Sequence, residues 1–126
     1  MAYTTEKHDK YVLIRINAEK LDTTVAPALK SELVVLSNDG FKNMIIDLSE
    51  TRYCDSSGLS AILVGNRLCK GNQGTLIITG VQDTVNKLIT ISQLHTILQI
   101  TPTLSEAVDM LYMEEVEKDL GEDIEQ

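Results

Sequence analysis

DLSETRYCDSSGLSAILVGNRLCK, residues 47–70, is the stretch of sequence that decides the fold. The apolar run Met44–Leu48, which leads into it, has the length of a buried strand. After the polar segment Ser49–Arg52, apolar residues recur at helical spacing on one side of a predicted helix: Leu59, Ile62, Leu63 and Cys69. The pattern therefore predicts a strand, a loop and a helix, with Asp55 and Ser56 at the junction of loop and helix.

This junction carries the residue types that are expected where a helix begins. The first backbone N–H groups of a helix lack partners inside the helix, and the short side chain of Asp55 or Ser56 can accept hydrogen bonds from them. In the simplest interpretation DSSG is a helix cap, and Ser57 is a helix-start residue without a role of its own. A junction of this kind also exposes the Ser56 hydroxyl to a kinase, and the small residues Ser57 and Gly58 keep the approach open.

A strand that ends at Asp47-Leu48, a polar loop, the sequence DSSGL and an apolar helix together resemble the STAS domain, the fold of bacterial anti-sigma factor antagonists. The resemblance covers residues 10–112. It implies that Ser56 is phosphorylated by a partner kinase and that Asp55 shapes its surroundings. It also implies an α/β fold, a STAS-like mixed β-sheet with about four helices packed mainly on one face.

One turn departs from the family's pattern. STAS domains carry a Gly-Glu-(apolar)-Asp turn after their first two strands, and the corresponding residues 18–22 read AEKLD. The aspartate is kept as Asp22, which the resemblance places in the partner-binding loop. The glycine is absent, and Lys20 occupies the acidic position. The detail of the partner-binding loop therefore differs from the family, whereas the fold prediction is unaffected.

Strand-like and helix-like segments alternate along the rest of the chain, which favours a mixed sheet covered by helices. Asp9-Lys10 is a plausible turn between the first two strands. Strands are predicted at Thr4–His8, Tyr11–Ile16, Asn43–Leu48 and Thr75–Thr79, with a last short strand around Ile100.

Three further helices are predicted from apolar spacing and from capping residues. The first follows the cap oxygens of Asp22-Thr23-Thr24, carries Pro27 in its first turn and ends at Gly40. A shorter helix follows the strand at Thr75–Thr79, and a capping box at Thr103–Glu106 starts the last one. Their core-facing residues are Leu29, Leu33 and Leu36; Val81, Val85, Leu88 and Ile89; and Leu104, Ala107, Val108, Leu111 and Tyr112.

The net charge of −8 lies mostly in an acidic C-terminal tail, residues 113–126. Seven acids against Lys118 give the tail −6, and the remaining twelve acids and ten bases give the body −2. A near-neutral body argues against nucleic-acid binding, which requires a basic face. We interpret residues 1–112 as the STAS domain and the tail as a helix extension or a disordered segment, solvated rather than an interaction arm.

Several classes of protein are excluded by what the sequence lacks. It has no charged-then-apolar signal segment and no apolar run near the ~20 residues that cross a bilayer, so we expect a cytoplasmic protein that contacts no membrane. Cys54 and Cys69 match no metal spacing and are expected to be small buried hydrophobes rather than a redox pair. No cofactor is expected, because Gly71–Gly74 lacks the Lys-Ser/Thr ending of a phosphate-binding loop.

An enzyme is also disfavoured. Ser56, Asp55 and His95 could be arranged as a hydrolase set, but the Gly-x-Ser-x-Gly elbow is missing and the chain has only two histidines. We expect His95 to be a surface or loop residue and His8 to lie at a strand end.

Val64 and Leu68 lie one helical turn apart and point away from the core side that Leu59 marks. They can pack against a neighbouring helix, or they can form an apolar patch beside Ser56 on which a kinase or an anti-sigma factor docks. The candidate partner-binding residues are Asp22, Asp55, Ser56, Ser57, Gly58, Val64 and Leu68.

The resemblance implies a non-catalytic switch. The unphosphorylated protein would bind a serine kinase that is also an anti-sigma factor, and so release a sigma factor. Phosphorylation of Ser56 would switch this binding off, and a serine phosphatase of the metal-dependent class would restore it. The altered turn at residues 18–22 leaves room for an alternative, a constitutive STAS scaffold or a transporter-associated interaction module without phospho-switching.

Overall fold

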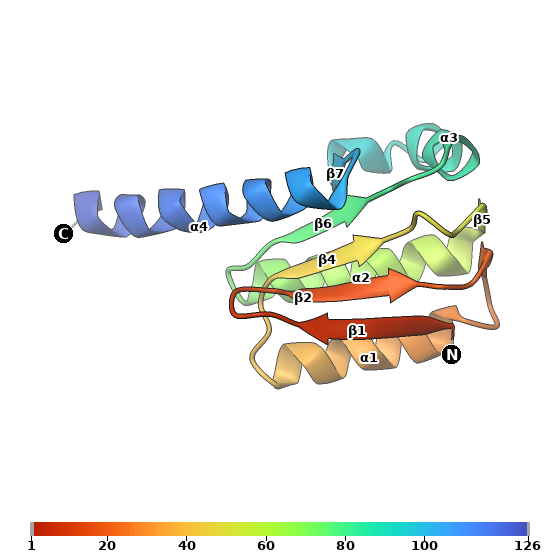
Figure 1. Cartoon of the computed structure of the whole chain (residues 1–126), viewed down its shortest axis with the longest axis horizontal. Helices are drawn as coiled ribbons and strands as arrows, with labels where there is room; N and C mark the ends of the chain where they lie inside the picture. Colours follow the sequence, from red (N-terminus) through yellow and green to blue (C-terminus); the bar gives the residue numbers. More distant parts are fainter. Residues whose placement is uncertain (1, 126) are drawn as a thin grey trace.

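Residues 2–125 are described by the structure, a computed structural model, and side chains are described for residues 2–121. The predicted strands and helices follow one another in the expected order, and two further strands of two residues each, at Lys20–Leu21 and Tyr53–Cys54, lie where the sequence predicted a turn and a loop (Figure 1). The strands are β1 (Tyr3–Lys7), β2 (Val12–Ile16), β3 (Lys20–Leu21), β4 (Met44–Asp47), β5 (Tyr53–Cys54), β6 (Leu76–Thr79) and β7 (Gln99–Thr101). The helices are α1 (Ala26–Asn38), α2 (Ser56–Gly71), α3 (Asp83–Ile91) and α4 (Leu104–Glu125), with a short 3-10 helix at Leu94–Thr96.

The main sheet of the described residues is mixed, in the order β1-β2-β4-β6-β7. β1 pairs antiparallel with β2 through a hairpin in which the His8 N–H donates to the Tyr11 carbonyl at 2.9 Å. The other neighbouring strands are parallel, and a segment that contains a helix connects each pair. Every residue of β4 and β6 is buried, which explains their nearly continuous apolar sequences. The mixed-sheet prediction is confirmed.

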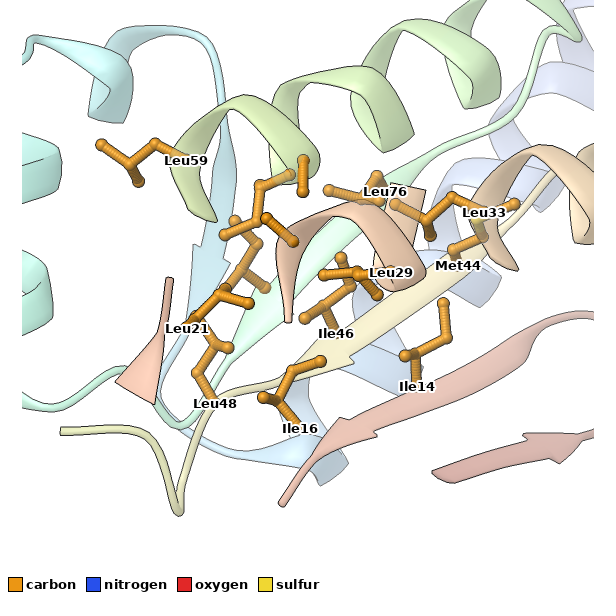
Figure 2. Close-up of a cluster of buried hydrophobic side chains, with 14 of the residues drawn as sticks. Ile14, Ile16, Leu21, Leu29, Leu33, Met44, Ile46, Leu48, Leu59 and Leu76 are labelled. Atoms are coloured by element: carbon orange, nitrogen blue, oxygen red, sulfur yellow. The ribbon is translucent and has the colours of Figure 1, made fainter. Parts of the chain in front are cut away.

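The sheet has a hydrophobic core on each face. The larger core lies between the sheet and the helices α1 and α2, where Leu29 lies over Ile46 and Leu33 lies beside Met44 (Figure 2). α3 joins this core through Val85 and Ile89. Among the described helices, α4 covers the opposite face, so the prediction of helices mainly on one face is confirmed. The buried residues of that second core are Leu13, Ile45, Ile77, Ala107 and Leu111.

The start of α1 differs from the prediction. Val25 is the N-cap residue, and it makes no side-chain cap hydrogen bond. The Asp22 carboxylate instead accepts hydrogen bonds from the N–H and the hydroxyl of Thr24, and the Asp22 carbonyl accepts one from the Ala26 N–H. The predicted side-chain cap was wrong because the chain makes a separate turn before the helix begins. Pro27, the second residue of α1, lies in the first turn as predicted.

The other helix starts agree more closely with the sequence. Thr103 caps α4, since its hydroxyl oxygen accepts a hydrogen bond from the Glu106 N–H at 3.2 Å, as the capping box predicts. Val85 and Ile89 of α3 are buried as expected, whereas Val81 lies before the helix rather than in it.

α4 continues past Tyr112 to Glu125, so the acidic tail is helical as far as the structure describes it. Glutamate side chains attach this part of the helix to the sheet. Glu114 accepts one hydrogen bond from the Thr75 hydroxyl at 2.5 Å and another from the Gln99 amide at 2.8 Å.

Glu115 and Lys118 make further attachments. Glu115 accepts a hydrogen bond from Asn43 at 3.0 Å, which holds the pKa of its carboxyl below the usual value, and it lies 3.7 Å from Lys42 Nζ. Lys118 Nζ donates to the Gln73 carbonyl at 2.8 Å. The expectation of a solvated tail was therefore wrong for this part of α4, while the division of the chain at residue 112 remains a prediction. Outside the described part lie Gln126 and the side chains of Glu122, Asp123 and Glu125.

Replacing Leu111 by alanine should destabilise the protein, because Leu111 is fully buried between α4 and the sheet. A buried Leu→Ala change costs about 2–5 kcal/mol of unfolding free energy. Met113 is 61% exposed, so Met113→Ala should change that free energy by less than about 0.5 kcal/mol. Urea unfolding followed by circular dichroism measures both variants. Equal losses would contradict the assignment of the buried face of α4.

Candidate functional site

The DSSG sequence forms the first turn of α2, at the edge of the sheet where β4 and β6 end. Asp55 is the N-cap residue, with extended backbone dihedrals. Its Oδ1 atom accepts hydrogen bonds from the Ser57 N–H at 2.9 Å, the Gly58 N–H at 3.0 Å and the Ser57 hydroxyl at 2.5 Å. The cap interpretation of the sequence is therefore confirmed for Asp55.

Ser56 is the first residue of α2, and its side chain is exposed. Among residues 2–121, whose side chains are described, none forms a hydrogen bond with the Ser56 hydroxyl, and the exposed residue is accessible from solvent. Asp55 already occupies the N–H groups of Ser57 and Gly58. These two donors are therefore not free for a group attached to Ser56.

Ser57 and Gly58 have structural roles that the sequence did not predict. The half-buried Ser57 donates its hydroxyl to Asp55, so it is more than a spacer at the helix start. Gly58 is buried, and a Cβ atom there would lie 2.4 Å from the Leu21 carbonyl oxygen and 2.7 Å from Cys54 Sγ. The expectation that Gly58 opens the approach to Ser56 was wrong. Its missing side chain instead lets the backbone of β3 lie against α2.

A two-stranded parallel sheet brings the Asp22 turn beside the start of α2. Leu21 of β3 is in register with Cys54 of β5, and the Asp55 N–H donates to the Leu21 carbonyl at 3.2 Å. The hydrogen bond from the Thr24 hydroxyl lowers the pKa of Asp22, and the nearby charge of Asp55 partly opposes this. The structure thus brings Asp22 close to Asp55 and Ser56, which lie far from it in the sequence.

A groove of about 420 Å³ lies between these two segments. Tyr53 lines it and is 52% exposed, and the Lys20 ammonium lies 6.0 Å from the centre of its ring, within the range of a cation–π contact. Sequence analysis missed Tyr53, although a large aromatic residue in a polar loop next to DSSG is a signal that could have identified it. The groove is lined by Lys20, Leu21, Asp22, Tyr53, Cys54 and Asp55.

Val64 and Leu68 lie further along α2, on its half-buried side. At 1.5 Å per residue, Val64 is roughly 12 Å from Ser56 along the helix axis. Both residues line a second groove, of about 480 Å³, between the ends of α1 and α2. Leu68 also packs against the main core, and Asn72 donates a hydrogen bond to Ser37 of α1 at 2.8 Å. Part of their apolar surface is thus used by the neighbouring helix and part is exposed.

The remaining reactive groups do not form a second site at this edge. Burial raises the pKa of both the Cys54 and the Cys69 thiols to about 12, so both are neutral near pH 7. His95 is exposed, as expected. Across residues 2–125, no group of three or more His, Cys, Asp and Glu side chains could hold a metal ion. None of the helices in this range combines the length and apolar composition needed to cross a membrane.

Comparison with known proteins agrees with the resemblance noted in the sequence. A family model for the STAS domain matches residues 2–107. The anti-sigma-B factor antagonist of Staphylococcus aureus is 27% identical over 96 residues, which cover 76% of this chain and 88% of that protein.

Solved structures share the fold at lower sequence identity. A putative anti-sigma factor antagonist from Thermotoga maritima superposes with a TM-score of 0.78 at 20% identity, covering 87% of this chain and 94% of that one. The phosphorylated form of the Bacillus cell fate determinant SpoIIAA superposes with a TM-score of 0.69 at 22% identity, covering 86% of this chain and 98% of that one. A sulfate transporter family protein from Wolinella succinogenes superposes with a TM-score of 0.71 at 19% identity, covering 80% of this chain and 84% of that one. At these identities the likeness shows the fold.

Gly58→Ala should destabilise the protein by about 1–3 kcal/mol, the usual range for overpacking, because the new methyl group would overlap the Leu21 carbonyl. Gly71→Ala is the matched control on the same helix, since a Cβ there meets nothing within 4 Å. It should be neutral, or should stabilise by up to about 1 kcal/mol. Chemical unfolding measures both changes. A neutral Gly58→Ala would contradict the close packing of β3 on α2.

The pKa of Asp55 is lowered mainly by the hydrogen bond from the Ser57 hydroxyl. Because the folded pKa lies below the unfolded one, the carboxylate stabilises the fold above the unfolded pKa, and this contribution is lost as the pH falls through the folded pKa. Ser57→Ala should raise the pKa of Asp55 and reduce this loss of stability in acid, whereas Ser56→Ala should leave both unchanged. NMR titration of the carboxyl carbon measures the pKa. An unchanged pKa in Ser57→Ala would rule out the assigned hydrogen bond.

Proposed function

The chain belongs to the STAS domain family, and on that premise we propose that it acts as an anti-sigma factor antagonist. In its unphosphorylated form it binds a serine kinase that is also an anti-sigma factor, and this binding frees a sigma factor. Phosphorylation of Ser56 ends the binding. The protein is a cytoplasmic binding partner rather than an enzyme. The anti-sigma-B factor antagonists among its relatives support this function.

The exposed hydroxyl of Ser56 is the observation that carries the proposal. It stands at the first residue of α2, where the positive end of the helix favours an added phosphate and the Asp55 carboxylate opposes it. Because these local effects oppose each other and the phosphate faces solvent, the domain stays folded after phosphorylation. The similarity to SpoIIAA in its phosphorylated form supports a fold that accepts this modification.

A partner packed over Ser56 responds very differently to the same phosphate. Burying a charge without a counter-charge costs several kcal/mol, and about 4 kcal/mol corresponds to roughly a thousandfold loss of affinity. The modification therefore acts on binding and not on folding. A serine phosphatase of the metal-dependent class reaches the exposed phosphate once the partner has left, and it restores the binding form.

The docking surface extends from the Asp22 turn along α2. Asp22 and Tyr53 border the groove beside Ser56, and the half-exposed apolar side chains of Val64 and Leu68 continue it toward the end of the helix. Burial of such apolar surface supplies affinity, while Ser56 supplies the regulation. The proposed partner-binding residues are Asp22, Asp55, Ser56, Ser57, Val64 and Leu68, and the buried Gly58 supports this surface from beneath by letting β3 lie against α2.

A second candidate function is a constitutive STAS scaffold or a transporter-associated module. Two observations favour it: Lys20 stands where the family carries an acidic residue, and the fold also matches a sulfate transporter family protein. In that case the same surface would bind its partner regardless of the state of Ser56.

Partner recovery from the host distinguishes the two functions. Ser56→Ala cannot be phosphorylated and should retain a serine kinase, whereas Ser56→Asp should lose it by at least about tenfold, because it adds an unpaired charge to the interface. Ser105→Asp is the matched control, since it places the same charge on an exposed serine at the start of α4. All three variants should keep the circular dichroism spectrum of the wild type.

The recovered kinase is then incubated with Mg-ATP and each form of the protein, and the products are measured by intact mass. Wild type and Ser105→Asp should gain a phosphate, and Ser56→Ala should not. Equal binding of one partner by wild type and Ser56→Asp, without any gain of phosphate, would favour the scaffold and overturn the switch.

A further inference from the structure

The outer face of α4 carries apolar side chains that the domain does not cover. Met113, Val116 and Leu120 are 61%, 53% and 54% exposed. Their spacing of three and four residues places them on one side of the helix, and we refer to them as the α4 stripe. Figure 1 shows α4 extending past the ends of the strands, so its last turns lie beyond the sheet.

The orientation of this face is set by contacts on the other side of the helix. Leu111 is fully buried against the sheet, and Glu114, Glu115 and Lys118 are hydrogen-bonded to the body of the domain. The α4 stripe therefore points away from the domain because the opposite face is attached. Single exposed apolar residues such as Ile91 are ordinary, but a row at i, i+3 and i+7 has the spacing of anchors in helix recognition.

Negative charge surrounds the α4 stripe. Asp109 precedes Met113 by one turn, while Glu117 and Asp119 follow at spacings of three or four residues, and all three acids are exposed. Lys118 is the one base in the sequence of α4, and it points to the other side, where it binds the Gln73 carbonyl. The exposed face is thus apolar along its centre, with Asp109 at the N-terminal end of the row and Glu117 and Asp119 on its two sides.

We propose that the α4 stripe is a docking site for a basic amphipathic helix of a partner protein. Apolar residues of that helix cover Met113, Val116 and Leu120, and its Lys and Arg side chains pair with the bordering acids. A second copy of this chain fits less well, because two such faces would bring their acidic borders together. An anionic membrane surface would also be repelled.

This site is separate from the one at Ser56. α4 covers the face of the sheet opposite to α1 and α2, and the two faces have separate hydrophobic cores. A partner on α4 therefore does not compete with a kinase at the start of α2. The inference does not depend on the proposed phospho-switch, and Ser56→Asp should leave binding at the α4 stripe unchanged.

The test uses the full chain and a synthetic peptide of about 20 residues, with Leu on one helical face and Lys and Arg on the other. Fluorescence anisotropy should show saturable binding that weakens as salt is raised. The triple variant Met113→Ser, Val116→Ser, Leu120→Ser should bind at least about tenfold more weakly, as expected for loss of central anchors. Ile91→Ser, which removes a more exposed apolar side chain from α3, should bind like wild type.

Several results would overturn the proposal. The proposal fails if the wild type does not bind the peptide, or if the triple variant binds it as tightly as the wild type does. It also fails if the wild type binds equally well a scrambled peptide that has the same charge but no apolar face. Concentration-dependent dimerisation of the wild type that the triple variant loses, measured by analytical ultracentrifugation, would instead identify a second copy as the occupant. Because the three residues are exposed, the triple variant should keep the circular dichroism spectrum of the wild type. An unchanged spectrum would show that weaker binding does not come from unfolding.

Discussion

The close approach of the β3 backbone to the first turn of α2 is the constraint on which the functional edge depends. The Leu21 carbonyl accepts the Asp55 N–H at 3.2 Å, and it lies where any side chain at position 58 would have to fit. With Gly58 in place, Asp55 caps the helix and Ser56 is left on the outside. One hydrogen bond and one missing side chain thus bring the Asp22 turn and the serine to a common surface.

The division of the sheet into two covered faces separates the surface at Ser56 from the exposed face of α4. β4 and β6 are buried on both faces, with α1 and α2 on one and α4 on the other. A charge added at the start of α2 meets solvent and the Asp55 carboxylate, and both cores remain untouched. Such a domain can change its surface chemistry at Ser56 without repacking, while α4 stays available for another contact.

Local signals in the sequence predicted much of this arrangement. The strand before DSSG, the helix after it and the cap at Asp55 each depend on residues close together in the sequence, so the sequence pattern was sufficient. The role of Gly58 depends on Leu21, and the attachment of Glu115 depends on Asn43. These contacts join residues far apart in the sequence, and neither periodicity nor charge content reveals them. For the same reason a tail that is acidic by composition proved to be held partly against the sheet.

The most direct measurement is an amide chemical-shift map of the protein before and after enzymatic phosphorylation of Ser56. If the phosphate acts as a local change of surface charge, the shifts will be confined to β5, the first turns of α2 and the adjoining β3 turn. The amides of β2, β4, β6 and α4 will then keep their positions. Shifts spread through those strands and through α4 would contradict the account, because they would mean that phosphorylation rearranges the fold rather than its surface.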